Sequence, residues 1–377
     1  MKLLIVILFV LFVLLYLLRH RQINEGFTDN KLIKAFKIRI GLFYDKDYTS
    51  YYNFVYKMSS FIPIEIVKYT DRFQIFYELK RRNVDFIFTN EKDYYVYWIN
   101  QNKKKKSIID SMRRNPEIQA ITMAFYQYVF IIADYKKIIT KNDINGSVVA
   151  IMGKNSLGQD FEIELFEKFK TNMIYRTGDL KKDFDNLCKT TDILLSINEH
   201  PSKQLLQYSN SKEIYLIDID EFETSKDYYD KYLFLNKKKM KLTYYPEIYQ
   251  RYNSINRLGS LLIDTSPYMN AFAVKTLLMG LDTVSNQYVY EFMKVYYNNI
   301  FDAIEKNIYF NNFTDIEMSA SRLAGPNGVL NIHEGARKFY TKVGNYTLNS
   351  SRKCDFLNTE CTDDELASFG DYVPEAH

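Results

Sequence analysis

A pattern of short apolar runs and amphipathic segments, present twice, constrains the fold of this chain most strongly. The first copy has apolar runs that predict strands at 38–44, 62–67 and 84–89. Between them, apolar residues at helical spacing predict helices over 48–60 and 71–82. This order of strand, helix, strand, helix and strand predicts a parallel sheet whose ligands bind at the carboxyl ends of its strands.

The second copy follows after about sixty residues, and it predicts another unit of the same kind. Its predicted strands are 147–152, 173–175, 193–197 and 214–219, and its predicted helices are 159–169 and 179–188. A further long helix, rich in Tyr, Phe and Met, is expected over 288–304. Two such units predict an α/β fold with two lobes and a central cleft between them, which is a favoured place for ligands.

The amino terminus predicts a membrane anchor ahead of the two lobes. The run 3–18 is apolar without interruption, and sixteen helical residues rise about 24 Å, nearly the width of a hydrocarbon core. No pair of small residues suited to signal cleavage follows it, so we expect an uncleaved, single-pass helix. Arg19 and Arg21 outweigh Lys2, which favours the cytosolic or virion-interior face for the remainder.

These features give the expected organisation of the 377 residues. We expect an anchor at 1–21, a linker at 22–36, the first part of lobe 1 at 37–125, lobe 2 at 126–236, the return to lobe 1 with closing helices at 237–345, and a polar tail at 346–377.

Composition and motifs exclude several classes of function. The net charge of +4 gives no reason to expect a nucleic-acid partner. The three cysteines cannot form a disulfide scaffold; Cys188 is expected to be a buried thiol, and Cys354 and Cys361 have a spacing that suits one small loop disulfide. No nucleotide-binding, serine-hydrolase or metalloprotease motif occurs, so we expect neither an enzyme nor a cofactor.

A few polar residues are candidates for binding. The turn 153–158 joins a predicted strand to a predicted helix, where free N–H groups, Lys154 and Ser156 suit a carboxylate or phosphate; a plain connection has the same sequence. His200 either lines the cleft or lies in a solvated loop. The lysine runs 103–106 and 237–239 indicate solvated loops or, alternatively, contact with anionic lipid.

Several segments together resemble a known family. The segments are 38–90, DINGSVVA at 143–150, KMKLTYYPEIY at 239–249 and LNIHEGARKFYTKVG at 330–344, where His333 and Gly335 stand in matching places. In this order they resemble the TAXI group of TRAP-transporter solute receptors, within the type II periplasmic binding proteins. The resemblance implies two hinged lobes that close on a small anionic solute, a dicarboxylate or an amino acid.

The resemblance also implies positions for the ligand. It aligns Tyr51 and Tyr52 with an aromatic pair of the first lobe, and Asn155 and Ser156 with the ligand loop of the second. With neighbouring residues at the same strand ends and loops, the expected ligand-binding set is Tyr44, Ser50, Tyr51, Tyr52, Asn90, Lys154, Asn155 and Ser156. The first loop, from Tyr44 to Tyr48, is bulky and charged where the family has glycines.

Two functions therefore stay open. In the first, the chain is a membrane-anchored, non-enzymatic solute-binding protein. In the second, it is a structural or interaction protein of a membrane, and its pocket is degenerate. The membrane would be viral, because the amino-acid composition resembles that of proteins encoded by A/T-rich viral genomes. Large side chains at Tyr44, Tyr51 and Phe161 that fill the cleft would favour the second. An enzyme with this fold is a third reading, and it lacks a His or Cys constellation.

Overall fold

The computed structural model describes residues 37–44, 55–56, 58–59, 62–101, 117–138, 140–151, 160–177, 179–222, 224–232, 234–259, 267–305, 323 and 331–344. The expected anchor at 1–21, the linker, the polar tail and the pair Cys354 and Cys361 lie outside these residues. Among the helices in the described ranges, none is long and apolar enough to cross a membrane.

Ten strands form one sheet, and its first part contains the strands predicted nearest the amino terminus. Strand β1 (Ile38–Phe43) lies between β2 (Ile64–Tyr69) and β3 (Phe86–Asn90) and is parallel to both. The expected strands are confirmed here, with β2 and β3 beginning two residues later than the apolar runs suggested. Of the helix expected at 48–60, the described residues include Val55 and Met58, which are helical and buried.

The second part of the sheet repeats this arrangement. Strand β5 (Val148–Ile151) lies between β6 (Asn172–Tyr175) and β7 (Ile193–Glu199), and all three are parallel. The expected second unit is therefore confirmed as a set of parallel strands. In both parts the central strand is flanked by the next two strands of the chain.

Two long antiparallel strands connect the parts, and the sequence did not indicate them. Strand β4 (Ile118–Asp134) has 17 residues and pairs with β7, while β10 (Tyr268–Leu281) has 14 residues and pairs with β3. The two strands also pair with each other, and two β-bulges in β4 interrupt their register next to Thr276 and Leu278. Bulges increase local twist, so they bend the sheet between its two parts.

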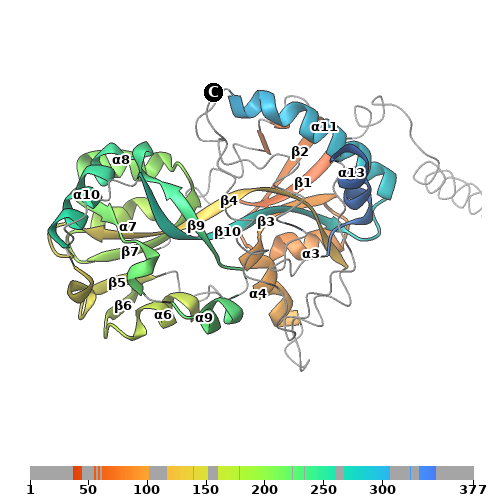
Figure 1. Cartoon of the computed structure of the whole chain (residues 1–377). Coiled ribbons are helices and arrows are strands. Elements are labelled where there is room, and N and C mark those ends of the chain that lie inside the picture. The colour runs from red at the N-terminus through yellow and green to blue at the C-terminus, as the bar shows by residue number, and fades with distance from the viewer. Residues whose placement is uncertain are drawn as a thin grey trace, which may run out of the picture.

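Figure 1 shows the result as two lobes joined by β4, β9 and β10. The first lobe contains β1, β2 and β3 with helices α3 (Gln74–Lys80), α4 (Glu91–Gln101), α11 (Asn286–Glu305) and α13 (Glu334–Gly344). The second contains β5, β6 and β7 with α6 (Asp160–Glu167), α7 (Leu180–Asn186), α8 (Lys203–Ser211), α9 (Lys226–Lys231) and α10 (Pro246–Gly259). Short 3-10 turns lie at Lys141–Ile144, Ile219–Phe222 and Leu242–Tyr244.

The return of the chain to the first lobe comes later than residue 237. Strand β9 (Asn236–Lys241) pairs with the first residues of β10, and β8 (Ile214–Leu216) pairs with the end of β4. Helix α10 packs on α8 and β8, and Arg251 donates hydrogen bonds to carbonyl oxygens of Ser209, Lys212 and Ile214 at 3.0–3.3 Å. These contacts place α10 against the second lobe, whereas the sequence assigned residues 237–345 to the return to lobe 1.

The lysine run 237–239 is part of β9 and not a loop. Backbone pairing with β10 fixes this segment, and its lysine side chains reach solvent or lie over rings and carboxylates. Lys237 contacts the carboxylate of Asp220, and Lys238 lies 5.3 Å from the ring centre of Tyr126. Charged side chains are common on strands next to a sheet edge because they oppose pairing with other chains.

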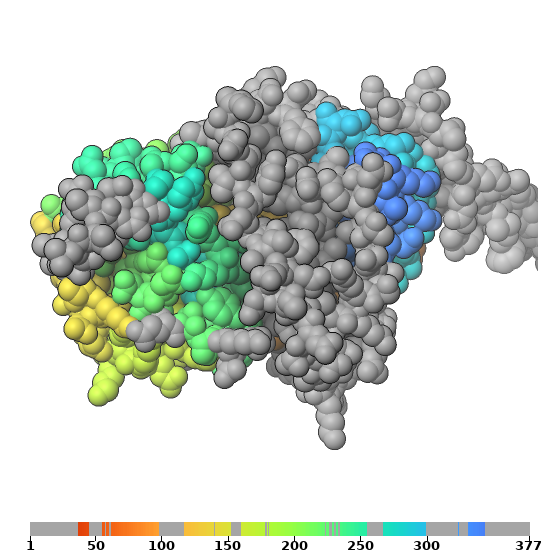
Figure 2. Space-filling view, viewed as in Figure 1, coloured from red at the N-terminus to blue at the C-terminus, as the bar shows by residue number. Residues whose placement is uncertain are grey.

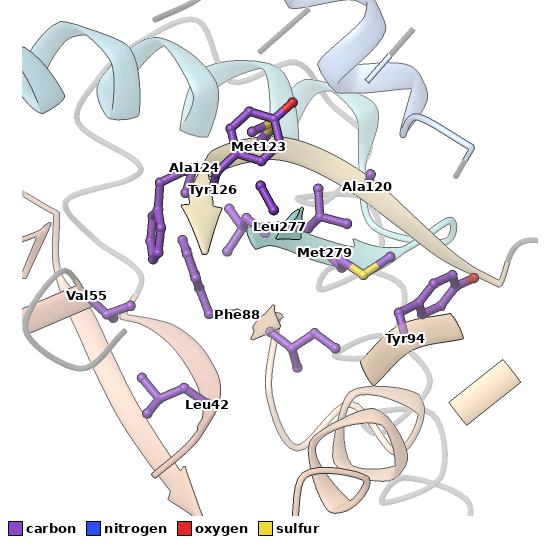
Figure 3. Packing of buried hydrophobic residues seen from close by; sticks show 14 of the residues in the cluster. Leu42, Val55, Phe88, Tyr94, Ala120, Met123, Ala124, Tyr126, Leu277 and Met279 are labelled. Atoms are coloured by element: carbon purple, nitrogen blue, oxygen red, sulfur yellow. The ribbon is translucent and has the colours of Figure 1, made fainter. Parts of the chain in front are cut away.

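Two apolar clusters form the core. The larger one fills the first lobe and continues under α7, α8 and α10, and Figure 3 shows its centre, where side chains of β1, β3, β4 and β10 meet. The smaller one lies between the sheet of the second lobe and α6, and it includes Phe161, Leu165 and Phe166, as the helical spacing predicted. In Figure 2 the described residues of the second lobe appear in yellow to green, and α11 and α13 in blue.

Candidate functional site

A stripe of polar side chains crosses the sheet where β4 and β10 pass from one lobe to the other. Asn90 of β3 pairs with Thr276 of β10, and Gln127 of β4 pairs with Glu199 of β7. Residues directly opposite share a face of the sheet, and Gln127 also pairs with Val274, two positions from Thr276. One face therefore carries all four, and we call them the polar stripe: Asn90, Thr276, Gln127 and Glu199.

Asn90 connects the stripe to the ends of the parallel strands. Helix α4 begins at the next residue, and Asn90 Oδ1 accepts a hydrogen bond from the backbone N–H of Asp93 at 2.7 Å, which caps the helix. Its Nδ2 donates to Gln127 Oε1 at 3.4 Å. Because Leu42 pairs with Phe88, the residues two positions further along, Tyr44 and Asn90, stand where β1 and β3 end side by side.

Thr276 is a member of the stripe whose side chain makes no hydrogen bond among the described residues. Its side chain is fully buried, and Oγ1 has no hydrogen-bond partner within the described ranges. Thr122 of β4, also buried, contrasts with it because its hydroxyl lies 2.7 Å from that of Tyr297 and 3.0 Å from that of Tyr340. An unpaired buried hydroxyl costs about 1–3 kcal/mol, so Thr276 offers a bond that a ligand atom would complete.

A buried ion pair involves the residues next to two members of the stripe, on the opposite face of the sheet. Glu91, the first residue of α4, places Oε2 3.5 Å from the ammonium nitrogen of Lys275, the neighbour of Thr276 in β10, and both side chains are 3% exposed. Burial raises the pKa of Glu91, and the Lys275 ammonium opposes that shift. Beyond this contact, neither carboxylate oxygen of Glu91 has a hydrogen-bond partner among the described residues.

Helix α4 also contacts the second lobe directly. The Lys92 ammonium lies 5.6 Å from the ring centre of Phe161 in α6, and the ring centres of Tyr95 and Phe234 are 5.6 Å apart. Burial lowers the pKa of Lys92 to about 8, and the nearby carboxylate of Glu162 opposes that shift. Lys92, Phe161 and Glu162 are all nearly inaccessible to solvent, so the two lobes meet here in a closed contact.

The structure describes two of the eight expected ligand-binding residues. Asn90 belongs to the polar stripe, and Tyr44 stands at the adjoining strand end, where its half-buried ring lies 4.3 Å from the Lys68 ammonium. The positions of Ser50, Tyr51, Tyr52, Lys154, Asn155 and Ser156 lie outside the described residues, so their roles stay predictions.

His200 and Cys188 differ from the expectations. His200 follows β7 but is 3% exposed, and its Nδ1 lies 3.1 Å from the Tyr245 hydroxyl; it is neither solvated nor on an open surface. Burial lowers its pKa to about 3. Cys188 is half-buried where a buried thiol was expected, because it lies in a turn with φ of 71°, and burial with the Asp134 carboxylate raises its pKa to about 11.

The sequence had not singled out Glu91, Gln127, Lys275 or Thr276. Gln127 and Lys275 each interrupt a long apolar run, and a polar side chain inside such a run is a recognisable signal of a buried, functional position. Their assembly depends on the pairing of β4, β10 and β3, which was not predicted.

No protein-family model matches the chain, and the search of curated proteins found no match. Among solved structures, a substrate-binding domain of a putative amino acid ABC transporter from Streptococcus pneumoniae is 10% identical, with a TM-score of 0.39, over 73% of this chain and 96% of that one. The GluR0 ligand-binding core from Nostoc punctiforme in complex with L-glutamate is 10% identical, with a TM-score of 0.38, over 73% and 98% of the two chains.

A periplasmic substrate-binding protein of an ABC transporter from Coxiella burnetii is 13% identical, with a TM-score of 0.37, over 74% of this chain and 99% of that one. Similarity at this level fixes neither a ligand nor a site residue for this chain. Membership of the TAXI group and a viral source do not follow from it either, and both stay expectations from the sequence.

Proposed function

We propose that the chain is a two-lobed binding protein that holds a small polar solute against the polar stripe, where the lobes join. The observation that carries this proposal is the fully buried Thr276 hydroxyl, which has no hydrogen-bond partner in the described part of the chain; the next residue of β10, Lys275, forms the buried pair with Glu91. Folded proteins satisfy most buried polar groups, so an exception calls for an explanation, which a bound solute atom would supply here.

Charge at the junction favours one class of solute. The buried charged side chains there include three cations and three carboxylates: Lys275 pairs with Glu91, Arg176 pairs with Asp183, and Glu162 acts electrostatically on Lys92. A dicarboxylate would add two negative charges to a balanced, poorly solvated set, whereas an amino acid adds one charge of each sign. Of the two expected solute classes, we therefore favour an amino acid.

The second function, a structural or interaction protein with a degenerate pocket, is supported by a different observation. Phe161 is fully buried, and its ring faces Lys92 of the other lobe, while Tyr95 and Phe234 meet nearby. These side chains fill part of the junction without any solute. In either case we propose that 3–18 anchor the chain in a membrane and that the chain performs no catalysis.

A thermal-shift screen of the full chain against amino acids, dicarboxylates and neutral sugars tests the proposed function. A ligand that binds the native state raises the melting temperature by mass action, by an amount that grows with its concentration. We expect amino acids to raise it and dicarboxylates to do so less. No shift with any compound would leave the structural function as the better account.

A further inference from the structure

One face of strand β9 carries a row of exposed lysines. Lys237, Lys239 and Lys241 are exposed on this face, whereas Lys238 and Met240 alternate with them and belong to the other face. Residues two positions apart in a strand are about 7 Å from each other, so the three ammonium groups follow one line. We call Lys237, Lys239 and Lys241 the lysine face.

The neighbouring strand adds uncharged polar and aromatic side chains to this face. Lys239 pairs with Asn270 of β10, and Lys241 pairs with Tyr268, which is 37% exposed. Residues that pair across two strands share a face of the sheet. Lysines beside a tyrosine, which has an apolar ring and a polar tip, suit the boundary between water and lipid headgroups.

The charge of the lysine face is only partly balanced. Lys237 contacts the carboxylate of Asp220. The carboxylate of Asp218 accepts hydrogen bonds from backbone N–H groups, among them that of Asp220 at 2.9 Å. Neither Lys239 nor Lys241 forms an ion pair with a carboxylate of the described residues. The lysine face therefore keeps an excess of positive charge.

Protection of the strand edge does not account for this arrangement by itself. Strand β9 pairs with β10 alone among the described strands, and charge on such a strand opposes pairing with other chains. That purpose does not require three charges of one sign on one exposed face. A surface of a single sign attracts ligands of the opposite charge, here anionic ones.

The anchor proposed at 3–18 favours lipid among the anionic partners. Lys37, the first described residue, follows Leu18 by 19 positions, and a chain of that length spans at most about 65 Å. The proposed anchor would therefore hold the lobes close to the bilayer, at a high effective concentration of headgroups. The cytosolic leaflet, which Arg19 and Arg21 favour for this part of the chain, has a negative surface potential.

We propose that the lysine face docks on an anionic lipid surface and so fixes how the lobes lie relative to the membrane. The inference rests on the anchor of the proposed function, and it is independent of solute binding at the polar stripe. A lysine near such a surface contributes about a fivefold preference for the docked form. Lys239 and Lys241 together should therefore contribute about thirtyfold.

Quenching of a fluorophore by lipids that carry a nitroxide on the headgroup tests this in the full chain. The fluorophore is attached at Thr243→Cys, an exposed position close to Lys241, after Cys188, Cys354 and Cys361 are changed to Ser. The chain is reconstituted in phosphatidylcholine vesicles with and without phosphatidylserine. We expect strong quenching with phosphatidylserine and little without it.

Two variants and a change of salt make the result specific. Lys239→Gln with Lys241→Gln should lower the ratio of docked to undocked protein about thirtyfold. Lys181→Gln with Lys189→Gln removes the same charge from exposed positions of the second lobe and should leave the quenching unchanged. Salt at about 1 M, where the screening length is about 3 Å, should abolish the quenching of the parent.

Three results would overturn the inference. The first is quenching that is equal with and without phosphatidylserine, or absent from both. The second is equal quenching of the parent and of Lys239→Gln with Lys241→Gln; if that variant does not fold, quenching that persists in about 1 M salt has the same meaning. The third is binding of the parent to heparin without quenching by lipid, which would identify a different anionic partner.

The docking and the anchor can fail separately. Extraction of phosphatidylcholine vesicles with alkaline carbonate tests the anchor alone. If the chain stays in these vesicles while quenching does not depend on phosphatidylserine, the anchor stands and the docking does not. If carbonate releases the chain while it still docks from solution on vesicles with phosphatidylserine, the docking stands and the anchor does not.

Discussion

The carboxylate of Glu91 and the ammonium of Lys275 lie 3.5 Å apart, and both side chains are 3% exposed. They join the first turn of α4 to the strand that crosses between the lobes, one residue along β10 from Thr276. The pair therefore contributes to the shape of the junction and to its balance of charge.

Removal of one partner should destabilise the protein strongly. Lys275→Met leaves a buried carboxylate without compensation, and we expect the free energy of unfolding to fall by about 3–5 kcal/mol. Glu91→Leu combined with Lys275→Met should lie close to the parent. Urea unfolding measures both, and Lys37→Met, which removes the exposed pair with Glu65, is the control with an expected loss below about 1 kcal/mol. If Lys275→Met were as stable as Lys37→Met, that result would contradict a buried ion pair between Glu91 and Lys275.

Lys92 should make stability rise at alkaline pH. Its pKa is about 8 in the folded chain and about 10.5 when unfolded, so the unfolded state binds more protons between these values. Below pH 8 the buried ammonium therefore lowers the free energy of unfolding by its full amount. As the pH rises from 8 to 10.5, the free energy of unfolding increases by up to about 3 kcal/mol. The measurement is the difference in unfolding free energy between the parent and Lys92→Met across this range; a constant difference would be the contrary result.

His200 should give a dependence of the same direction at acid pH, where stability also rises as the pH rises. Its pKa of about 3 lies below the unfolded value of about 6.5, so the unfolded state takes up a proton first as the pH falls. Stability is thus fully present above pH 6.5 and declines toward pH 3, at about 1.4 kcal/mol for each pH unit. His200→Gln lacks this dependence. Acid unfolding curves of the two proteins would be parallel if the histidine were in fact solvated.

Gly335, in the segment that resembles the TAXI group, allows α13 to approach α11 closely. A Cβ at this position would come within 2.3 Å of the backbone oxygen of Asn286 and 2.9 Å of Val289 Cβ. Gly335→Ala should therefore cost about 2 kcal/mol or more, since backbone must move. Gly146→Ala is the matched control: its Cβ meets open space, and only the positive φ of 76° opposes it, at about 1 kcal/mol. Equal melting temperatures would disprove the close packing.

Much of each parallel unit could be predicted, because a short buried strand and an amphipathic helix have different periods. Residues 38–44 and 193–197 are examples, and β1 and β7 occupy these positions. Strands β4 and β10 could not be recognised in the same way. Both are buried on nearly every residue, so their sequences are mostly apolar and have no period of two.

The site was less predictable than the fold. Asn90 stands at a predicted strand end, where ligands of parallel sheets are expected, and that reasoning found it. Thr276 lies 186 positions further along the chain, and only the antiparallel pairing of β10 with β3 brings the two together. The lysines of β9 were also misjudged: their charge suggested a loop, but their backbone pairs with β10 as a strand.

Titration calorimetry of the best amino acid from the screen, with the parent and with Thr276→Val, tests the central claim most directly. Valine keeps the shape of threonine and removes a hydroxyl that has no hydrogen-bond partner in the described part of the chain, so stability should hold or rise slightly. A solute that bonds to this hydroxyl should bind Thr276→Val about 5–30-fold more weakly, the effect of one lost hydrogen bond. Equal affinity for the two proteins would contradict a site at the polar stripe.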